Sequence, residues 1–230
     1  EDYRSILMQA DKDYSAYLQS GKRKRPYKDA DREWTRIKGL WKKASAVVSA
    51  QKLFEQGERV NPAQYRTLQT LIYLKFLADM PVRRLEYNQI RFVNTEPSER
   101  GNYIITHKNK PWVWSIGQYK TVKRFGKQVF PIPAGLKKIL TRLRPIVKAK
   151  NIDEYIFMNS RWKMMTRDSF SKFVKHIFKT YMGKDWTQNV IRSIKVSSVW
   201  KDSIKTIEAL QLAESMAHDV RTAMKHYRNN

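Results

Sequence analysis

The chain of 230 residues contains no cysteine, and this absence excludes disulfides, thiolate zinc sites and a cysteine nucleophile. The four histidines are scattered without metal-ligand spacing, so we expect no metal and no cofactor. Long hydrophobic runs are also missing. The longest apolar stretch, residues 68–80, is interrupted by Gln69, Lys75 and Asp79, which indicates a buried helix and not a membrane span. Because no signal peptide is visible, we expect an intracellular protein that does not associate with a membrane.

Acidic residues are scarce relative to basic ones. Asp and Glu number 21 against 46 Lys and Arg, which gives a formal charge of +25. Such a field suits a polyanion, and nucleic acid is the usual one. A generally solvated basic surface, as in a ribosomal or chromatin protein, is the alternative. The hydrophobic fraction of 41%, with seven Trp and nine Phe, is typical of a folded chain.

A basic connector divides the chain near residue 28. Residues 1–28 are predicted to form a short helix over 1–19 and a linker, and residues 29–230 the main domain. The linker carries four consecutive cations, Lys22, Arg23, Lys24 and Arg25. They suit a nuclear-localisation signal, a strap on the DNA backbone or a solvated linker. We expect a DNA-associated protein in a host nucleus or a bacterial cytoplasm, with the nucleus suggested by the Lys22–Arg25 run if it is a localisation signal.

The hydrophobic periodicity predicts an α+β fold that is mainly helical, with a small and mainly antiparallel sheet inserted after the first helices. Helices are expected over 29–57, 62–80, 134–150 with a break at Pro145, 167–181, 188–200, 203–216 and 220–227. Asn61 is the expected N-cap of the second of these, with proline at its first position. Strands are expected over 89–93, 103–106, 112–116 and 128–132.

Two arginines stand in contexts that suit phosphate binding. Arg83 and Glu86 are three residues apart, so a carboxylate can hold the guanidinium from behind while its fork meets a phosphate. Thr187 is a plausible N-cap for a helix that carries Asn189 and Arg192 on one face. The alternatives are a surface salt bridge for the first pair and a solvated helix face for the second.

Between these arginines lies a basic hairpin. Residues 118–133 have β-prone ends, Gly126 near the centre and a densely charged tip. The tip cations expected to contact DNA are Lys123, Arg124 and Lys127, and Lys120 precedes them. A lysine here could protonate a leaving 5′ oxygen, since lysine shifts its pKa readily among other cations. The alternative is a phosphate clamp without chemistry.

The C-terminal sequence places His218 nine residues before Tyr227. An unbroken helix would separate them by roughly 13 Å, too far to share a phosphate. Asp219 can cap a new helix, which would bring both side chains to one pocket. A packing tyrosine and a core histidine are the alternatives.

Taken together, these segments resemble the catalytic domain of tyrosine recombinases, the phage-integrase family. Arg83 with Glu86 resembles the first arginine box, the stretch from Lys120 to Pro133 the β-hairpin lysine segment, and residues 155–170 the approach to the second box. Asn189 to Arg192 resembles the His-x-x-Arg box, and His218 with Tyr227 the histidine and nucleophile pair. The resemblance covers roughly residues 30–230.

The chain departs from the family pattern at two positions, and one assignment is ambiguous. Asn189 stands where the family usually has histidine, and asparagine cannot shuttle a proton near neutral pH. Ala217 replaces the common glycine. Lys120 fits the Lys-Thr pattern, whereas Lys123 fits by its distance from the Pro-Ile-Pro end; we prefer Lys120.

The resemblance implies a site-specific recombinase or integrase that cleaves and rejoins double-stranded DNA through a 3′-phosphotyrosine, without metal or ATP. Tyr227 would be the nucleophile, with Arg83, Arg192, His218 and the hairpin lysine neutralising the transition state. The resemblance also implies homotetramers on DNA, although an isolated catalytic fragment could be monomeric. Residues 1–28 could then be the remnant of a DNA-clamping domain, with residues 29–230 as the catalytic domain. The competing interpretations are a type IB topoisomerase and a non-catalytic DNA-binding protein that retains the fold.

Overall fold

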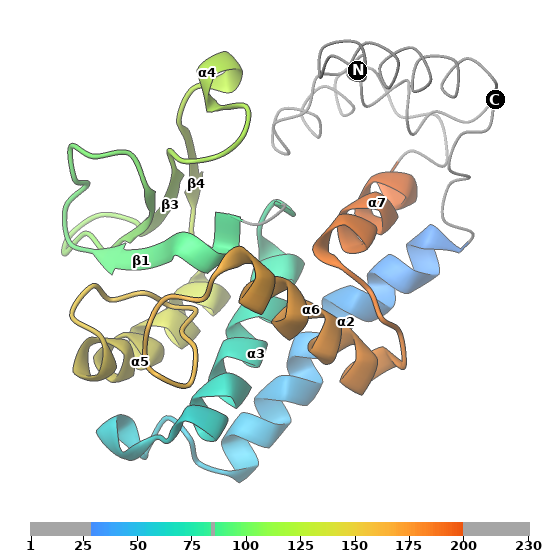
Figure 1. Ribbon diagram of the computed structural model, residues 1–230, viewed down its shortest axis with the longest axis horizontal. Coiled ribbons are helices and arrows are strands. Elements are labelled where there is room, and N and C mark those ends of the chain that lie inside the picture. Colours follow the sequence, from blue (N-terminus) through green and yellow to red (C-terminus); the bar gives the residue numbers. More distant parts are fainter. Residues whose placement is uncertain (1–28, 84–85, 200–230) are drawn as a thin grey trace, which may run out of the picture.

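The computed structural model describes residues 29–83 and 86–199, and these form a mainly helical α+β unit with one four-stranded sheet (Figure 1). The mixed fold class predicted from the sequence is confirmed at this level. The predicted boundary near residue 28 and the helices predicted over 1–19, 203–216 and 220–227 lie outside the described residues. They stay predictions.

Helices α2 (Ala30–Ala50) and α3 (Pro62–Asp79) pack against each other, with the short 3-10 helix η1 (Gly57–Arg59) between them. Asn61 caps α3 as predicted: its side chain accepts from the Gln64 amide, and the Gln64 side chain accepts from the Asn61 amide, both at 3.0 Å. α2 buries a single stripe of apolar residues, whereas α3 is buried around most of its circumference. α3 is therefore the central helix of the core.

The sheet follows the 3-10 helix η2 (Glu86–Gln89) and has the order β1-β2-β3-β4. Its strands are β1 (Ile90–Val93), β2 (Asn102–Ile105), β3 (Val113–Ile116) and β4 (Gln128–Pro131), within a residue of the predicted ranges. Strands β2–β3 and β3–β4 are antiparallel, as expected for most of the sheet, but β1 pairs with β2 in parallel.

The predicted hairpin is present, and its tip holds a short helix. β3 and β4 pair from Val113 with Pro131 to Ile116 with Gln128, and α4 (Val122–Phe125) occupies the connection. Gly126 follows α4 with a φ of 66°, a conformation that favours glycine. In Figure 1 the hairpin carries α4 away from the helical body. The cations of the tip are thereby held outward on a defined support.

Helix α5 (Ala134–Lys150) corrects one expectation, because it continues through Pro145 without a break. Proline removes one helical hydrogen bond and normally kinks a helix. Here Leu140 and Leu143 before the proline, and Ile146 and Val147 after it, are all buried on the same core. The free energy gained by burying these apolar side chains before and after Pro145 outweighs the cost of the lost hydrogen bond.

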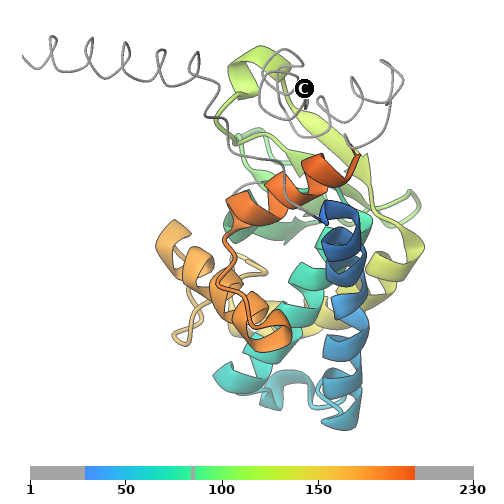
Figure 2. The same cartoon turned by 90° about the vertical axis from the view of Figure 1, so that its right-hand side faces the viewer.

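The last two described helices are α6 (Arg167–Met182) and α7 (Gln188–Val199). Thr166 caps α6 by accepting from the Ser169 amide, and Thr187 accepts from the Val190 amide in the first turn of α7. α7 packs against α2, as Figures 1 and 2 both show. Consequently the segment that bears the second arginine rests on the helical body of the protein.

An aromatic cluster joins the helices to the sheet. Tyr87 stacks with Trp114 of β3 and Phe170 of α6, with ring centroids 5.5 and 6.1 Å apart, and meets Tyr73 and Phe76 of α3 edge-on. All five rings are fully buried. Because Tyr87 lies only four residues after Arg83, the packing of this cluster fixes the position of the chain segment that carries the first arginine.

Candidate active site

Arg83 is buried, with 2% of its surface exposed. Its Nη1 donates to Oε1 of Gln128 on β4 at 2.8 Å, and its Nη2 lies 4.0 Å from Oε1 of Glu86. The predicted pairing with Glu86 is therefore present, but the alternative of a surface salt bridge is wrong. The arginine joins the segment after α3 to the start of β4, where the hairpin strands meet the tip.

The Arg83 guanidinium also lies over the ring of Tyr119, with its carbon 4.7 Å from the ring centroid. Burial lowers the pKa of Arg83 from its ordinary value, and the nearby Glu86 only partly opposes this shift. Burial is therefore the larger influence on the pKa of this guanidinium. The planar fork of an arginine can donate two hydrogen bonds to the oxygens of one phosphate.

The main chain of Arg83 is held on both sides by side chains. Its amide donates to the Tyr87 hydroxyl at 3.2 Å, and its carbonyl accepts from Nε2 of Gln188 at 2.6 Å. Oε1 of Gln188 accepts in turn from the Tyr73 hydroxyl. Sequence reasoning missed these residues, as well as Gln128 and Tyr119, because neither their type nor their spacing distinguishes them from ordinary core and surface residues.

Arg192 comes to the same place from α7. It is 7% exposed, which contradicts the alternative of a solvated helix face, and it lies one helical turn after Gln188. Burial raises the pKa of the Tyr87 phenol, and the charges of Arg83 and Arg192 both act against this rise. Two arginines far apart in the sequence thus act on a single hydroxyl group.

Asn189 differs from Arg192 in its surroundings. The two were expected on one helical face, yet Asn189 is exposed and Arg192 is buried. Three residues on an α-helix differ by roughly 60° in direction, and the buried side of α7 ends between them. The buried neighbour of Arg192 is Gln188 instead.

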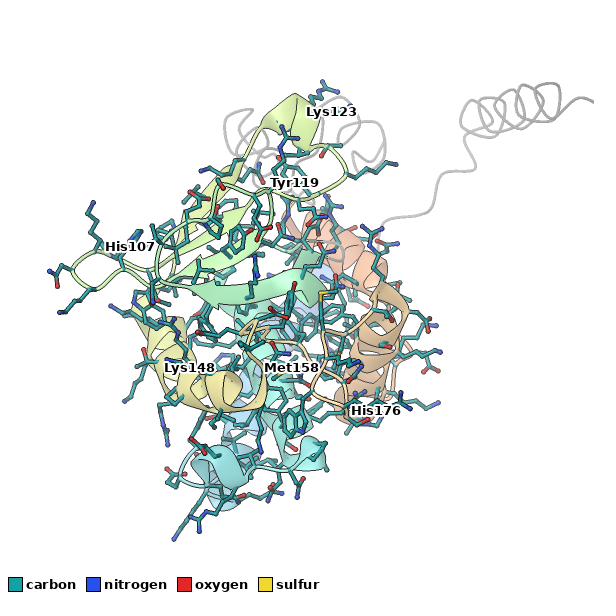
Figure 3. All side chains as sticks on the ribbon, turned by 60° about the vertical axis from the view of Figure 1, so that its left-hand side comes forward. His107, Tyr119, Lys123, Lys148, Met158 and His176 are labelled. Atoms are coloured by element: carbon teal, nitrogen blue, oxygen red, sulfur yellow. The ribbon has the colours of Figure 1, made fainter. Side chains whose placement is uncertain are left out.

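The hairpin lysines lie in different hollows. Lys120 is exposed and lines a pocket of about 340 Å³ with Glu86, Gln118, Tyr119 and Arg167 among others. Lys123 lines a second hollow of about 630 Å³ together with Glu96 and Lys127. Figure 3 shows Lys123 at the hairpin tip and Tyr119 nearer its base. Lys120 therefore lies on the side of the Arg83–Glu86 pair, while Lys123 lies further out.

The cations of the hairpin tip are exposed to solvent. Lys123, Arg124 and Lys127 are all exposed, as their predicted role in binding DNA requires. Lys127 pairs with Oε2 of Glu96 at 2.8 Å, and Oε1 of Glu96 accepts from Ser115 at 2.6 Å. These contacts connect the base of the hairpin tip to the loop that follows β1.

Comparison with family models and with curated protein sequences finds no match. Comparison of the fold with solved structures does find one. The fold is similar to that of a XerA recombinase. The TM-score is 0.50 and the sequence identity 13%, over 79% of this chain and 56% of that chain. This chain therefore spans little more than half the length of the XerA recombinase, and the similarity is one of fold.

The similarity to the XerA recombinase agrees with the recombinase-like arrangement expected from the motifs, namely a helical body with a small sheet between its first and later helices. It does not test the role of any side chain. Tyr227, His218 and the cations from Lys22 to Arg25 lie outside the described residues, and their roles stay predictions.

Within residues 29–83 and 86–199, no group of three or more His, Asp or Glu side chains is arranged to hold a metal ion. Over the same part of the chain, no helix is long and apolar enough to cross a membrane.

Proposed function

We propose that this protein is a DNA strand transferase of the tyrosine recombinase type, acting in site-specific recombination or integration. The observation that carries the proposal is that Arg83 and Arg192, two buried arginines selected from separate sequence motifs, both act electrostatically on the Tyr87 hydroxyl. Buried guanidiniums suit a phosphate whose negative charge grows in the transition state. The fold similarity to a XerA recombinase supports the same function.

In the proposed reaction the Tyr227 phenol gives its proton to solvent water and its oxygen attacks a backbone phosphorus. A bond forms between the phenolic oxygen and phosphorus, and the bond to the 5′ oxygen breaks. Lys120, or Lys123 in the alternative, donates the proton that turns the leaving oxygen into a hydroxyl. A 5′-hydroxyl of a second strand then reverses these steps and reseals the backbone, so the energy of the phosphodiester is retained in the covalent intermediate.

The other residues of the site would bind the reacting phosphate. Arg83 and Arg192 would neutralise its non-bridging oxygens together with His218, and Glu86 would orient Arg83. Asn189 could donate a hydrogen bond but could not transfer a proton near neutral pH. No step requires a metal or another cofactor.

Double-stranded DNA is the proposed partner, held by the basic surface. The linker cations Lys22 to Arg25 and the hairpin cations Lys123, Arg124 and Lys127 would contact its backbone. Each phosphate contact releases counterions, so binding should weaken steeply with salt. Strand exchange between two duplexes would require a tetramer on DNA, and the protein would be located where that DNA is.

Trapping a covalent complex tests the proposal. Nicked duplexes of random sequence serve as substrate, since cleavage near the nick releases a short fragment and prevents resealing. We expect the full chain to form an adduct that survives denaturing electrophoresis and maps by mass spectrometry to Tyr227. Tyr227→Phe should abolish the adduct and keep DNA binding, whereas the control Tyr181→Phe, at a half-buried tyrosine of α6, should keep both.

The remaining outcomes separate the competing functions. Relaxation of supercoiled DNA by the wild-type chain without any strand exchange would indicate a type IB topoisomerase. DNA binding without any adduct would overturn the proposal and favour a non-catalytic DNA-binding protein. Asn189 at the family's histidine position, exposed at the start of α7, is the observation that favours this second candidate.

A further inference from the structure

Gln188 occupies a position that the proposed chemistry does not use. It is the first residue of α7, it is 3% exposed, and both ends of its amide are engaged. Nε2 donates to the Arg83 carbonyl at 2.6 Å, and Oε1 accepts from the Tyr73 hydroxyl. A buried amide with two partners on two other segments fixes the distance between them.

The direction of these hydrogen bonds follows from chemistry. A main-chain carbonyl can only accept, so the amide must turn its NH₂ group toward Arg83 and its oxygen toward Tyr73. Burial raises the pKa of the Tyr73 phenol well above its ordinary value, which keeps the hydroxyl protonated as the donor. Tyr73 itself is held by edge-on contacts with Tyr87, Phe170 and Phe173. The chain of hydrogen bonds is thus anchored on a fully buried aromatic cluster of the core.

Gln188 and Arg192 lie one turn apart on α7, so a contact from Gln188 to Arg83 also sets the distance between the two arginines. The two arginines belong to segments that are otherwise tied to different partners: Arg83 to Gln128 of β4, and α7 to α2. Within the described residues, the bond from Gln188 to the Arg83 carbonyl is a direct link between them. Its loss would leave a buried carbonyl without this donor and allow the peptide after Arg83 to turn.

We propose that Gln188 is a positioning residue, which holds the main chain of Arg83 in register with Arg192 so that both guanidiniums meet the same DNA phosphate. The proposal rests on the function proposed above. Gln188 does not touch the phosphate; it acts through the Arg83 carbonyl. An error of about 1 Å in the placement of a catalytic group can slow a reaction by roughly a hundredfold, which sets the scale of the expected effect.

The test compares Gln188→Met with Tyr73→Phe. Methionine has nearly the shape of glutamine but cannot donate to Arg83, whereas Tyr73→Phe removes only the hydrogen bond on the far side of the amide. We expect Gln188→Met to lower the single-turnover rate of adduct formation on nicked DNA by about a hundredfold with unchanged DNA affinity. Tyr73→Phe should lower the rate by less than about threefold, because the donor to Arg83 remains.

A spectroscopic signature reports on the positioning without any reaction. Arg83 and Arg84 form the single Arg-Arg pair in the sequence. A chain labelled with carbonyl-¹³C arginine and ¹⁵N arginine therefore gives one carbonyl–amide correlation peak, from the peptide that Gln188 contacts. This peak should shift in Gln188→Met and stay close to the wild-type position in Tyr73→Phe.

Each result decides the proposal. Equal losses of rate in the two variants, in proportion to their losses of unfolding free energy, would show a purely structural role and overturn it. If the wild-type chain forms no adduct, the proposed function fails, and an unshifted peak in Gln188→Met overturns the positioning role separately. Should Gln188→Met not fold, Gln188→Asn keeps the buried amide but shortens it, and the same rate and peak changes are expected.

Discussion

Because Arg83 is buried, we expect its charge to lower the stability of the folded protein even though the proposed reaction needs it. The decisive perturbation replaces the Arg83–Glu86 pair by Arg83→Met with Glu86→Gln, which removes both charges and keeps most of the side-chain volume. We expect the doubly substituted protein to be at least as stable as the wild type. At the same time, adduct formation should fall by about 10² to 10³, as it does when one transition-state donor is removed.

The magnitude follows from the contacts of Arg83. The substitution removes the 2.8 Å hydrogen bond to Gln128, worth about 1.5–3 kcal/mol for a charged donor, and the contact over Tyr119, worth about 0.5–1 kcal/mol. The attraction between charges 4.0 Å apart amounts to about 4 kcal/mol at an effective dielectric of 20. Against these stands the desolvation of a guanidinium that is 2% exposed and of its carboxylate partner, several kcal/mol for each.

The pKa of Arg83 shows which contribution is larger. It is lowered, with burial as the main cause, so the folded protein disfavours the charged form relative to the unfolded chain. Arginine stays charged at every accessible pH, and the penalty is therefore present throughout. Removing the pair should change the free energy of unfolding by between zero and a gain of about 2 kcal/mol.

Urea denaturation followed by circular dichroism measures the stability, and the nicked-DNA assay measures the rate. The control applies the same two substitutions to another pair, Arg144→Met with Glu154→Gln. Arg144 donates to Glu154 at 2.9 Å and to Asn94 at 3.0 Å, and also to Thr106, and it lies away from the proposed site. The control should lose about 1.5–3 kcal/mol and keep the wild-type rate.

Two results would refute the reasoning. If the double substitution lowered the free energy of unfolding by more than about 3 kcal/mol, the folded state would depend on the Arg83–Glu86 charges for its stability. An unchanged rate of adduct formation would mean that Arg83 does not act on the phosphate.

Three further predictions concern other parts of the chain. Lys120→Ala should slow cleavage at least about a hundredfold and be rescued by a 5′-bridging phosphorothiolate, which needs no proton, whereas Lys123→Ala should mainly weaken DNA binding in a filter assay. Asn61→Ala removes the cap of α3 and should lower the unfolding free energy by about 1 kcal/mol in urea. Burial and the charge of Lys38 lower the pKa of Lys195 from its ordinary value of 10.5. Below the lowered pKa the buried ammonium therefore destabilises the folded state, and this penalty is lost as the pH rises toward 10.5. Lys195→Met should stabilise the protein in thermal unfolding at pH 7, and this gain should shrink toward pH 10.

Much of the fold was predictable because local signals dominate it. The cap at Asn61, the four short strands and the helix over 167–181 follow from capping chemistry, β-prone runs between turn signals and helical periodicity, which act over a few residues. Two features were not predictable in this way. The parallel pairing of β1 with β2 is a choice of strand direction that local sequence signals do not specify, and α5 passes Pro145 because of burial that a local pattern does not reveal.

Some residues of the candidate site could be selected from the sequence, and others could not. Arg83 and Arg192 could be selected from the sequence, because a guanidinium can bind a phosphate bidentately and the two motifs occur in order with the hairpin and the C-terminal segment. The side chains that hold Arg83 in place could not be selected, since Gln128 and Gln188 are ordinary amides whose importance lies in what they face after folding. Asn189 and Gln188 are adjacent in the sequence, and burial alone separates them.

This division has a physical reason that bears on the function. A group that contacts the phosphate must carry positive charge or donate a strong hydrogen bond, so only a few residue types qualify and the sequence reveals them. A group that positions such a residue needs only the right shape and one donor, and many side chains qualify. If the two arginines bind one phosphate, the precision of the site depends on the second kind of residue. Substitutions at Gln128 and Gln188 should therefore affect the rate more than the affinity for DNA, and substitutions at the exposed hairpin cations should do the reverse.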